Sequence, residues 1–104
     1  VAAKHAINGL VKSASHEVGT LGITVNALCP GAIETDIMMA EGPPAAESMG
    51  LDYEGLLDMF SSESAIKKLN EVEDVAAVAT LLASDAGAGI TGSLISIDGG
   101  TAPY

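Results

Sequence analysis

The chain has 104 residues, 48% of them hydrophobic, a length and composition that fit one domain with a single core. It carries 14 acidic residues against four lysines and no arginine, and this balance excludes nucleic acid as a partner because phosphate backbones would be repelled. One cysteine excludes an intramolecular disulfide and is typical of a reducing compartment, and no apolar run is long enough to span a bilayer, so we expect a cytoplasmic protein with no membrane partner.

The first predicted element is an amphipathic helix from Val1 to about Thr20. Its apolar residues recur at spacings of three and four, as one packed helix face requires. Gly19 and Gly22 are expected to end this helix, one of them in the left-handed conformation. The two histidines of the helix lie about three turns apart, too far to share one ion, so no metal site is expected. Lys4 lies in the first turn, where the helix dipole disfavours a cation, and taken alone it is most simply a surface charge.

A strand is predicted next, within Ile23–Asp36, whose sequence is ITVNALCPGAIETD. β-branched residues are dense at its start, and no charge interrupts the run. Pro30 cannot donate a ladder hydrogen bond and Gly31 tolerates unusual backbone angles, so the strand should end in a turn there. Two interpretations are open. The turn is either an ordinary one, or a ligand site at the carboxyl end of a strand, where a bare glycine admits a flat ring or a phosphate and Thr35 offers a hydroxyl.

Residues 36–70 show little periodicity and are rich in Met, Gly, Pro and acids. The triplet Gly42-Pro43-Pro44 is expected to break the backbone before a weakly helical stretch near Tyr53–Phe60. Such a segment is typical of a mobile cover that orders over a ligand, although an ordinary excursion with a few buried methionines explains the pattern equally well. Between residues 36 and 63 it carries seven carboxylates and no Lys or Arg, a field that would repel a substrate carboxylate.

A helix and a strand are predicted in the last third of the chain. The helix begins at Asn70 or Glu71, where the run from Asn70 to Glu73 resembles a capping box, and it ends near Ser84. Its buried stripe is predicted to consist of Val75, Val78, Ala79 and Leu82. The strand covers Ser93–Ile97, and a helix between two strands of one sheet implies a right-handed crossover.

Four stretches of this chain, in the same order, resemble the short-chain dehydrogenase/reductase family. VAAKHAINGLVKSASHE is similar to the family's active-site helix after its Tyr-x-x-x-Lys motif, and NALCPGAIET is similar to its N-A-x-x-P-G-x-I-x-T segment. VEDVAAVATLLASD resembles the family's penultimate helix, and ITGSLISIDGG resembles its last strand. The resemblance covers most of the chain except the middle third, which corresponds to the family's substrate lid.

The resemblance implies an α/β fold, the carboxyl-terminal part of a Rossmann-type doubly wound parallel sheet, with two strands, flanking helices and a mobile lid at residues 36–70. We expect residues 1–104 to form one partial Rossmann domain whose amino-terminal cofactor-binding half is absent. If Lys4 is the motif lysine, the family's catalytic Tyr would fall immediately before Val1. The family's Ser, its Asn and its Gly-rich first turn would also lie upstream.

The resemblance also implies a set of site residues. Lys4 would be catalytic, because its ammonium would bond the nicotinamide ribose hydroxyls and its charge would lower the pKa of the catalytic Tyr. The turn would back the nicotinamide, the main chain of Ile33 would bond the carboxamide, and Thr35 with Ile37 would border the carboxamide or the diphosphate. The cofactor would be NAD or NADP. The implied cofactor-binding residues are Lys4, Pro30, Gly31, Ile33, Thr35 and Ile37.

Two functions are weighed on these grounds. The first is part of an NAD(P)-dependent oxidoreductase that transfers a hydride between nicotinamide and a secondary alcohol or ketone, with residues 1–104 inactive by themselves. The second is a non-catalytic folding or dimerisation module.

Two strands leave open edges, so we expect a homo-oligomer through the first helix and those edges. The opening VAAKH resembles the 3-hydroxybutyrate dehydrogenases of the family, whose substrate is an anion, whereas the acidic middle segment favours a neutral or cationic alcohol or ketone.

Overall fold

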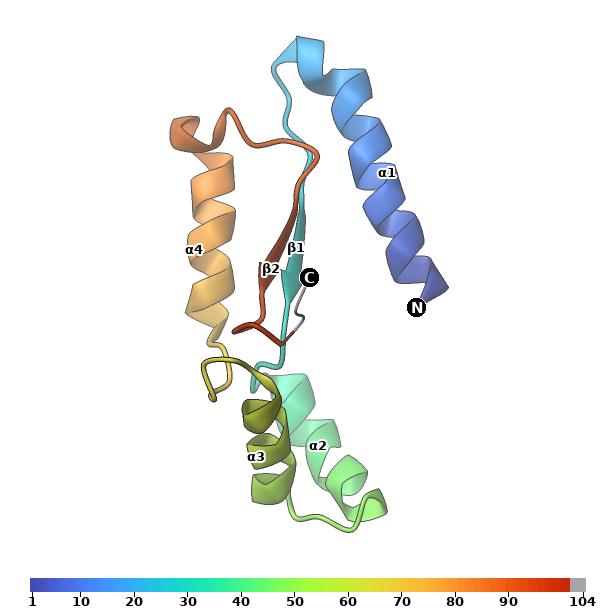
Figure 1. Cartoon of the computed structure of the whole chain (residues 1–104), viewed down its shortest axis with the longest axis vertical. Coiled ribbons are helices and arrows are strands. Elements are labelled where there is room, and N and C mark those ends of the chain that lie inside the picture. The colour runs from blue at the N-terminus through green and yellow to red at the C-terminus, as the bar shows by residue number, and fades with distance from the viewer. Residues whose placement is uncertain (102–104) are drawn as a thin grey trace. The chain divides into compact units, whose positions relative to one another are not determined.

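The computed structural model describes residues 1–101, which fold into two compact units. The first unit contains residues 1–29 and 76–95, and the second contains residues 30–75 and the described residues from 96 onward. Within these residues, no helix has both the length and the apolar composition that crossing a bilayer requires. The elements run along the chain (Figure 1) in the order α1 (Ala2–Val18), η1 (Gly19–Leu21), β1 (Ala27–Pro30), α2 (Asp36–Ser48), α3 (Tyr53–Glu63), α4 (Val72–Ala83), η2 (Asp85–Gly87) and β2 (Leu94–Ile97), where η denotes a 3-10 helix.

The strands β1 and β2 lie side by side as a two-stranded parallel sheet (Figure 1). At one end of the pair, Ala27 N–H donates to Ser93 O at 2.9 Å. Just past the other end, Gly31 N–H donates to Ile97 O at 3.0 Å. The predicted α/β class, with two parallel strands and helices between them, is therefore confirmed.

The first strand begins at Ala27, later than the start predicted at Ile23. Ahead of the strand, the side chain of Asn26 takes the place of backbone ladder bonds. Its amide nitrogen donates to Ile90 O at 2.9 Å, and its side-chain oxygen accepts Ser93 N–H at 3.1 Å. The predicted start was wrong because side-chain bonds satisfy the neighbouring backbone here without strand geometry.

The helix α1 confirms the first predicted helix, and it continues into η1. Gly22 is the left-handed residue that ends this segment, with φ 74°, whereas Gly19 keeps a helical φ of −59°. Ser15 is the one buried residue of α1. The predicted apolar face is largely open, since Ile7 is 50% exposed and Leu10 is 67% exposed.

The helix α2 runs without a break through Pro43 and Pro44. The predicted break at Gly42-Pro43-Pro44 is therefore wrong. Proline fixes φ close to the helical value, so it removes backbone hydrogen bonds from a helix without forbidding the helical angles. The packing of α2 against α3 offsets the lost bonds, because Gly42 and Ala46 are buried and Gly42 lies against Tyr53 of α3.

The helices α2 and α3 pack against each other and form the core of the second unit (Figure 1). Ala46, with no exposed surface, and Leu56, 3% exposed, are the buried hydrophobic side chains within residues 1–101. A Cβ added to Gly42 would lie 2.5 Å from Cε1 of Tyr53, so the glycine lets the aromatic ring pack directly on the backbone of α2. Asp52 caps α3. The helical stretch predicted near these residues is thus confirmed.

The first turn of α4 is capped by Asp74 and not by the predicted Glu73. Oδ2 of Asp74 accepts Glu71 N–H at 2.8 Å and the side-chain amide of Asn70 at 3.3 Å. The backbone bond from Glu71, followed by the Asn70 bond, holds the pKa of the Asp74 carboxyl below its ordinary value. The bond from Glu71 N–H to Asp74 is one half of a capping box, shifted by one residue from the predicted position.

The stripe predicted as buried on α4 is only half-buried. Val75, Val78 and Leu82 are partly covered, and Ala79 is exposed, so the prediction was wrong for that residue. A hollow of about 370 Å³ borders this face of the helix in the first unit. Its lining residues are Thr24, Asn26, Leu28, Ala79, Leu82 and Ala83. Because alanine side chains are short, they leave this space unfilled. The apolar periodicity of the sequence therefore predicted more burial of this helix face than the structure has.

Candidate functional site

The turn that follows β1 is fixed by the residues that follow β2. Gly31 N–H donates to Ile97 O, and a Cβ added to Gly31 would lie 2.7 Å from the Cα of Asp98. Real Cβ atoms essentially never approach other heavy atoms within 3.0 Å, so the close approach of these two backbone segments requires glycine. Pro30 beside it is exposed. Packing therefore explains Gly31 by itself, and ligand contact at Pro30 and Gly31 stays a prediction.

The next residues fix the entry into α2. Ile33 forms an isolated parallel bridge with Asn70, whose N–H donates to Ala32 O at 3.2 Å. Thr35 is the N-cap of α2, and its Oγ1 accepts Met38 N–H at 3.4 Å. A hydroxyl that accepts one bond still has its own hydrogen to donate. Thr35 can therefore cap the helix and donate to a ligand at the same time.

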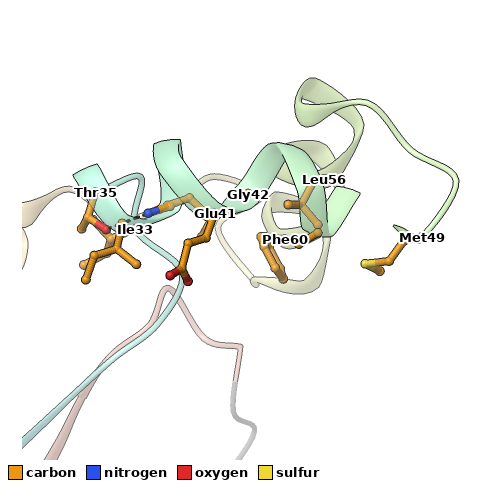
Figure 2. A pocket seen from close by; sticks show the side chains of 10 residues that line it. Ile33, Thr35, Glu41, Gly42, Met49, Leu56 and Phe60 are labelled. Carbon is orange, nitrogen blue, oxygen red and sulfur yellow. Dashed lines mark hydrogen bonds between the residues drawn. The ribbon is translucent and has the colours of Figure 1, made fainter. Parts of the chain in front are cut away.

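Three of the predicted site residues line one cavity of about 310 Å³ in the second unit: Ile33, Thr35 and Ile37. Figure 2 shows Ile33 and Thr35 at one end of this cavity, with Leu56, Phe60 and Met49 toward the other. The volume lies at the lower end of the range for small-molecule sites, roughly 300–1,000 Å³. The remaining lining residues are Met38, Glu41, Gly42, Ala45, Met49, Leu56 and Phe60.

The walls of this cavity are mostly apolar, and Glu41 is the charged residue among its described lining. In Figure 2 the Glu41 side chain lies between the end formed by Ile33 and Thr35 and the ring of Phe60. Within residues 1–101 the Glu41 carboxylate has no hydrogen-bond or ion-pair partner. Among the side chains of the described lining, the polar groups that a ligand would meet are thus the Thr35 hydroxyl and one unpaired carboxylate.

A bond between Tyr53 and Glu34 connects α3 to the segment that carries Thr35. The Tyr53 hydroxyl donates to Glu34 Oε2 at 2.8 Å. Partial burial and then the Glu34 carboxylate raise the pKa of Tyr53 above its ordinary value of 10.0. A tyrosine that serves as general base needs the opposite shift, so Tyr53 has a structural role here.

Lys4 belongs to the first unit, whereas the other five predicted site residues belong to the second. It is the third residue of α1 and is exposed. No partner for its ammonium group is found within the part of the chain that the structure describes. The side chain is therefore unengaged, and its catalytic role stays a prediction.

Ile33, Thr35 and Ile37 were predicted as site residues, whereas the other lining residues from α2 and α3 were not. A spacing of four runs from Ile37 through Glu41 and Ala45 to Met49, the C-cap of α2, and Leu56 and Phe60 repeat it on α3. This spacing places side chains on one helix face. The signal was present in the sequence, but the expected break at the two prolines concealed it.

The first unit has a polar hollow of about 290 Å³ around Lys12, Ser15, His16, Thr91 and Gly92. The Lys12 ammonium donates to Gly92 O at 2.9 Å, so this cation already serves the packing of α1 on the loop before β2. No group of three or more His, Cys, Asp or Glu side chains within residues 1–101 is arranged to hold a metal ion.

Comparison with known sequences relates nearly the whole chain to one family. The family profile described as Enoyl-(Acyl carrier protein) reductase matches residues 1–102. D-beta-hydroxybutyrate dehydrogenase of Rhizobium meliloti (strain 1021) is 41% identical over 101 residues, which make up 96% of this chain and 39% of that protein. The chain thus spans about two fifths of the length of the curated relatives it matches.

Solved structures of dehydrogenases and reductases share this fold. 4-Hydroxyisoleucine dehydrogenase complexed with NADH matches with a TM-score of 0.79 and 31% identity over 99% of this chain and 39% of that chain. A variant of actinorhodin polyketide ketoreductase with NADPH matches with a TM-score of 0.88 and 27% identity over 99% of this chain and 40% of that chain. The Rossmann-type architecture is confirmed, and both nicotinamide cofactors occur among these neighbours.

Proposed function

The chain belongs to the short-chain dehydrogenase/reductase family, and from this premise we propose that it forms part of the active site of an NAD(P)-dependent oxidoreductase. The proposed reaction interconverts a secondary alcohol and a ketone. The proposal concerns the protein in which residues 1–104 are joined to the family's remaining catalytic groups.

One observation carries this proposal. Ile33, Thr35 and Ile37 follow directly after the strand β1 and form a wall of the apolar cavity. Ligands of parallel α/β sheets bind beyond the carboxyl ends of the strands, where backbone groups and helix termini converge. This position of the cavity supports a site in which a cofactor and a substrate meet.

The same segment has the groups that a nicotinamide needs. The Thr35 hydroxyl has a hydrogen to donate to the carboxamide oxygen, and the exposed side chains of Pro30 and Ile37 offer apolar surface to one face of the ring. Asp36 stands in the first turn of α2, where its charge disfavours a diphosphate and leaves the uncharged carboxamide as the better partner. The presence of NADH in one structural neighbour and NADPH in another supports either cofactor.

When bound, the nicotinamide supplies hydride chemistry. In the oxidation, the C–H bond at the carbinol carbon would break and its hydrogen would pass with the electron pair to the oxidised nicotinamide, while the O–H proton would pass to a general base and the C=O bond would form. Lys4 is proposed to bind the ribose hydroxyls and to favour the anionic form of a tyrosine base through its charge. Neither Tyr53 nor Tyr104 stands four residues before Lys4, so residues 1–104 by themselves are proposed to be inactive.

Residues 36–70 are proposed to be the substrate lid of one partial Rossmann domain formed by residues 1–104. The helices α2 and α3 fall within this segment and supply most of the cavity wall. A lid that carries the substrate wall can close over the reacting carbon and exclude water from it.

The test uses the protein as its gene encodes it, including any residues that flank this chain. Lys4→Met removes the charge and keeps the length of the side chain, and it should lower kcat/KM by about 10²–10⁴-fold, the usual contribution of acid–base catalysis. Lys68→Met is the matched control, because Lys68 is an exposed lysine near the end of the proposed lid and does not line the cavity. Equal activity of the two variants would remove Lys4 from the mechanism.

A second function, self-association, is supported by the open face of α1. Ile7 and Leu10 are half or more exposed, and Leu21 in η1 is 71% exposed. Apolar residues gathered at this spacing are typical of a helix face that packs on a partner. Leu10→Glu should shift sedimentation toward the monomer, whereas His5→Glu, which lies on the other side of the same helix, should not. Identical sedimentation of both variants would exclude this interface.

A further inference from the structure

The cavity of the second unit has walls suited to an apolar ligand. Leu56 is buried and Phe60 is half-buried at one end, and Met38 of α2 and Met49, the C-cap of α2, add to the apolar lining. Methionine side chains are flexible and adapt to irregular apolar shapes. The volume of about 310 Å³ restricts the ligand to a small molecule.

The charge in this cavity has one sign. No Lys, Arg or His is among the described lining residues, and the unpaired carboxylate of Glu41 lies between the Thr35 end and Phe60 (Figure 2). The other six carboxylates of residues 36–63 do not line the cavity, and Asp52 is engaged as the cap of α3. Of the seven carboxylates in residues 36–63, Glu41 is therefore the one that a ligand in this cavity would meet.

The described lining residues would present a ligand carboxylate with a like charge and with no counter-charge. Removing a carboxylate from water is costly unless a cation or several hydrogen-bond donors replace the water. Among the described lining side chains, the Thr35 hydroxyl is the one donor. A neutral ketone or alcohol needs only such a donor for its oxygen, and its carbon chain matches the apolar walls.

We propose, resting on the function proposed above, that Glu41 is a specificity-determining residue that selects small apolar ketones and secondary alcohols without a carboxylate. The inference sets the substrate class apart from that named for the Rhizobium meliloti relative, whose name specifies a hydroxy acid. Glu41 acts by repulsion: it excludes the anion and leaves the binding of the neutral substrate to the apolar walls.

The kinetic test compares acetoacetate with its neutral ethyl ester, in the protein as encoded and with both NADH and NADPH. The unmodified protein should show a kcat/KM for the ester at least about tenfold above that for the acid. A tenfold difference in kcat/KM is the effect expected when a single like charge disfavours the acid. Glu41→Lys should reduce or reverse this ratio. Glu47→Lys is the matched control, because Glu47 is an exposed residue of α2 that does not line the cavity, and it should leave the ratio unchanged.

A binding measurement without cofactor gives a second readout. With ¹³C-methyl methionine, the signals of Met38 and Met49 should shift on addition of the ester, and those of Met39 and Met59, which do not line the cavity, should not. Acetoacetate should shift none of them in the unmodified protein and should shift Met38 and Met49 in the Glu41→Lys variant.

The outcomes separate this inference from the proposed function. Turnover of the acid equal to or better than that of the ester overturns the role of Glu41 and leaves the oxidoreductase proposal intact. Absence of turnover with either cofactor overturns the oxidoreductase proposal and the substrate inference with it. If Glu41→Lys leaves both the ester-to-acid ratio of kcat/KM and the methionine shifts unchanged, residues other than Glu41 discriminate between acid and ester. That result overturns the inference.

Discussion

Asp98 occupies the space that a side chain at Gly31 would need. A Cβ on Gly31 would lie 2.7 Å from Cα and 2.8 Å from Cβ of Asp98. Two consequences follow for the turn after β1. Its glycine is required for the packing of the two strand ends, and its backbone is fixed by that packing before any ligand arrives. A preformed turn loses little entropy when it binds a rigid ring.

Gly31→Ala should destabilise the protein by about 1–3 kcal/mol, the usual cost of forcing a methyl group into a filled space. Gly9→Ala is the matched control, because a Cβ at Gly9 meets nothing within 4 Å in the middle of α1. This control should stabilise the protein by roughly 0.5–1 kcal/mol through helix propensity. Urea denaturation of both variants measures the difference, and equal stability of Gly31→Ala and the unmodified protein would contradict the packing account.

The turn after β1 also shows which of its features could be predicted from the sequence alone. The position of the turn followed from the chemistry of Pro30 and Gly31 alone, since one residue lacks a donor and the other lacks a side chain. The atom that Gly31 must avoid belongs to Asp98, far along the chain, and a local pattern cannot specify such a partner. For the same reason the start of β1 was placed too early, because the bonds of Asn26 depend on Ile90 and Ser93.

Replacement of the prolines in α2 should stabilise the protein. Pro43 and Pro44 lie in the helix interior and are exposed, so an alanine there restores a backbone hydrogen bond without removing buried surface. Each change to alanine should raise the free energy of unfolding by up to about 3 kcal/mol. Glu47→Ala is the control, since it restores no bond. A lower denaturation midpoint for Pro44→Ala would show that α2 is not a continuous helix at this point.

The helix α2 also shows why most of the cavity could not be predicted from the sequence. The Gly-Pro-Pro triplet is a strong local signal for a break, but the helix persists because α2 packs against α3, with Gly42 against the Tyr53 ring and Ala46 buried. Once the helix is continuous, the spacing of Ile37, Glu41 and Met49 places them on one face. The cavity could therefore be recognised only after the tertiary contact that overrides the local preference was known.

Alkaline pH should weaken the contact between α3 and the segment before α2. The pKa of Tyr53 is raised in the folded protein, so the native state holds this proton more tightly than the unfolded state. The stability from this group is complete below pH 10.0, the ordinary value, and is lost as the pH rises through the folded pKa. Urea midpoints measured against pH should fall less steeply in Tyr53→Phe. Glu34→Gln should bring the absorbance titration of Tyr53 back toward its ordinary pKa, and an unchanged titration would show that the bond is absent in solution.

Acid should weaken the start of α4. The pKa of Asp74 is lowered in the folded protein, so its contribution to stability is present above the ordinary value of 3.8 and is lost as the pH falls through the folded pKa. Asp74→Ala should remove that part of the acid dependence. Glu73→Ala distinguishes the two possible caps. In the structure Asp74 accepts the Glu71 N–H, whereas the sequence pattern predicted Glu73 as the capping residue. An acid profile altered by Glu73→Ala and not by Asp74→Ala would contradict the observed cap.

Hydride transfer itself can be followed by isotope. The protein as encoded is supplied with NADH or NADPH carrying deuterium at the transferable C4 position, together with ethyl acetoacetate, and the product alcohol is analysed by NMR and mass spectrometry. The account predicts one deuterium at the carbinol carbon, with the rate of labelling strongly reduced in Lys4→Met and unchanged in Lys68→Met. A product alcohol without deuterium at that carbon, or no product with either cofactor, would contradict it.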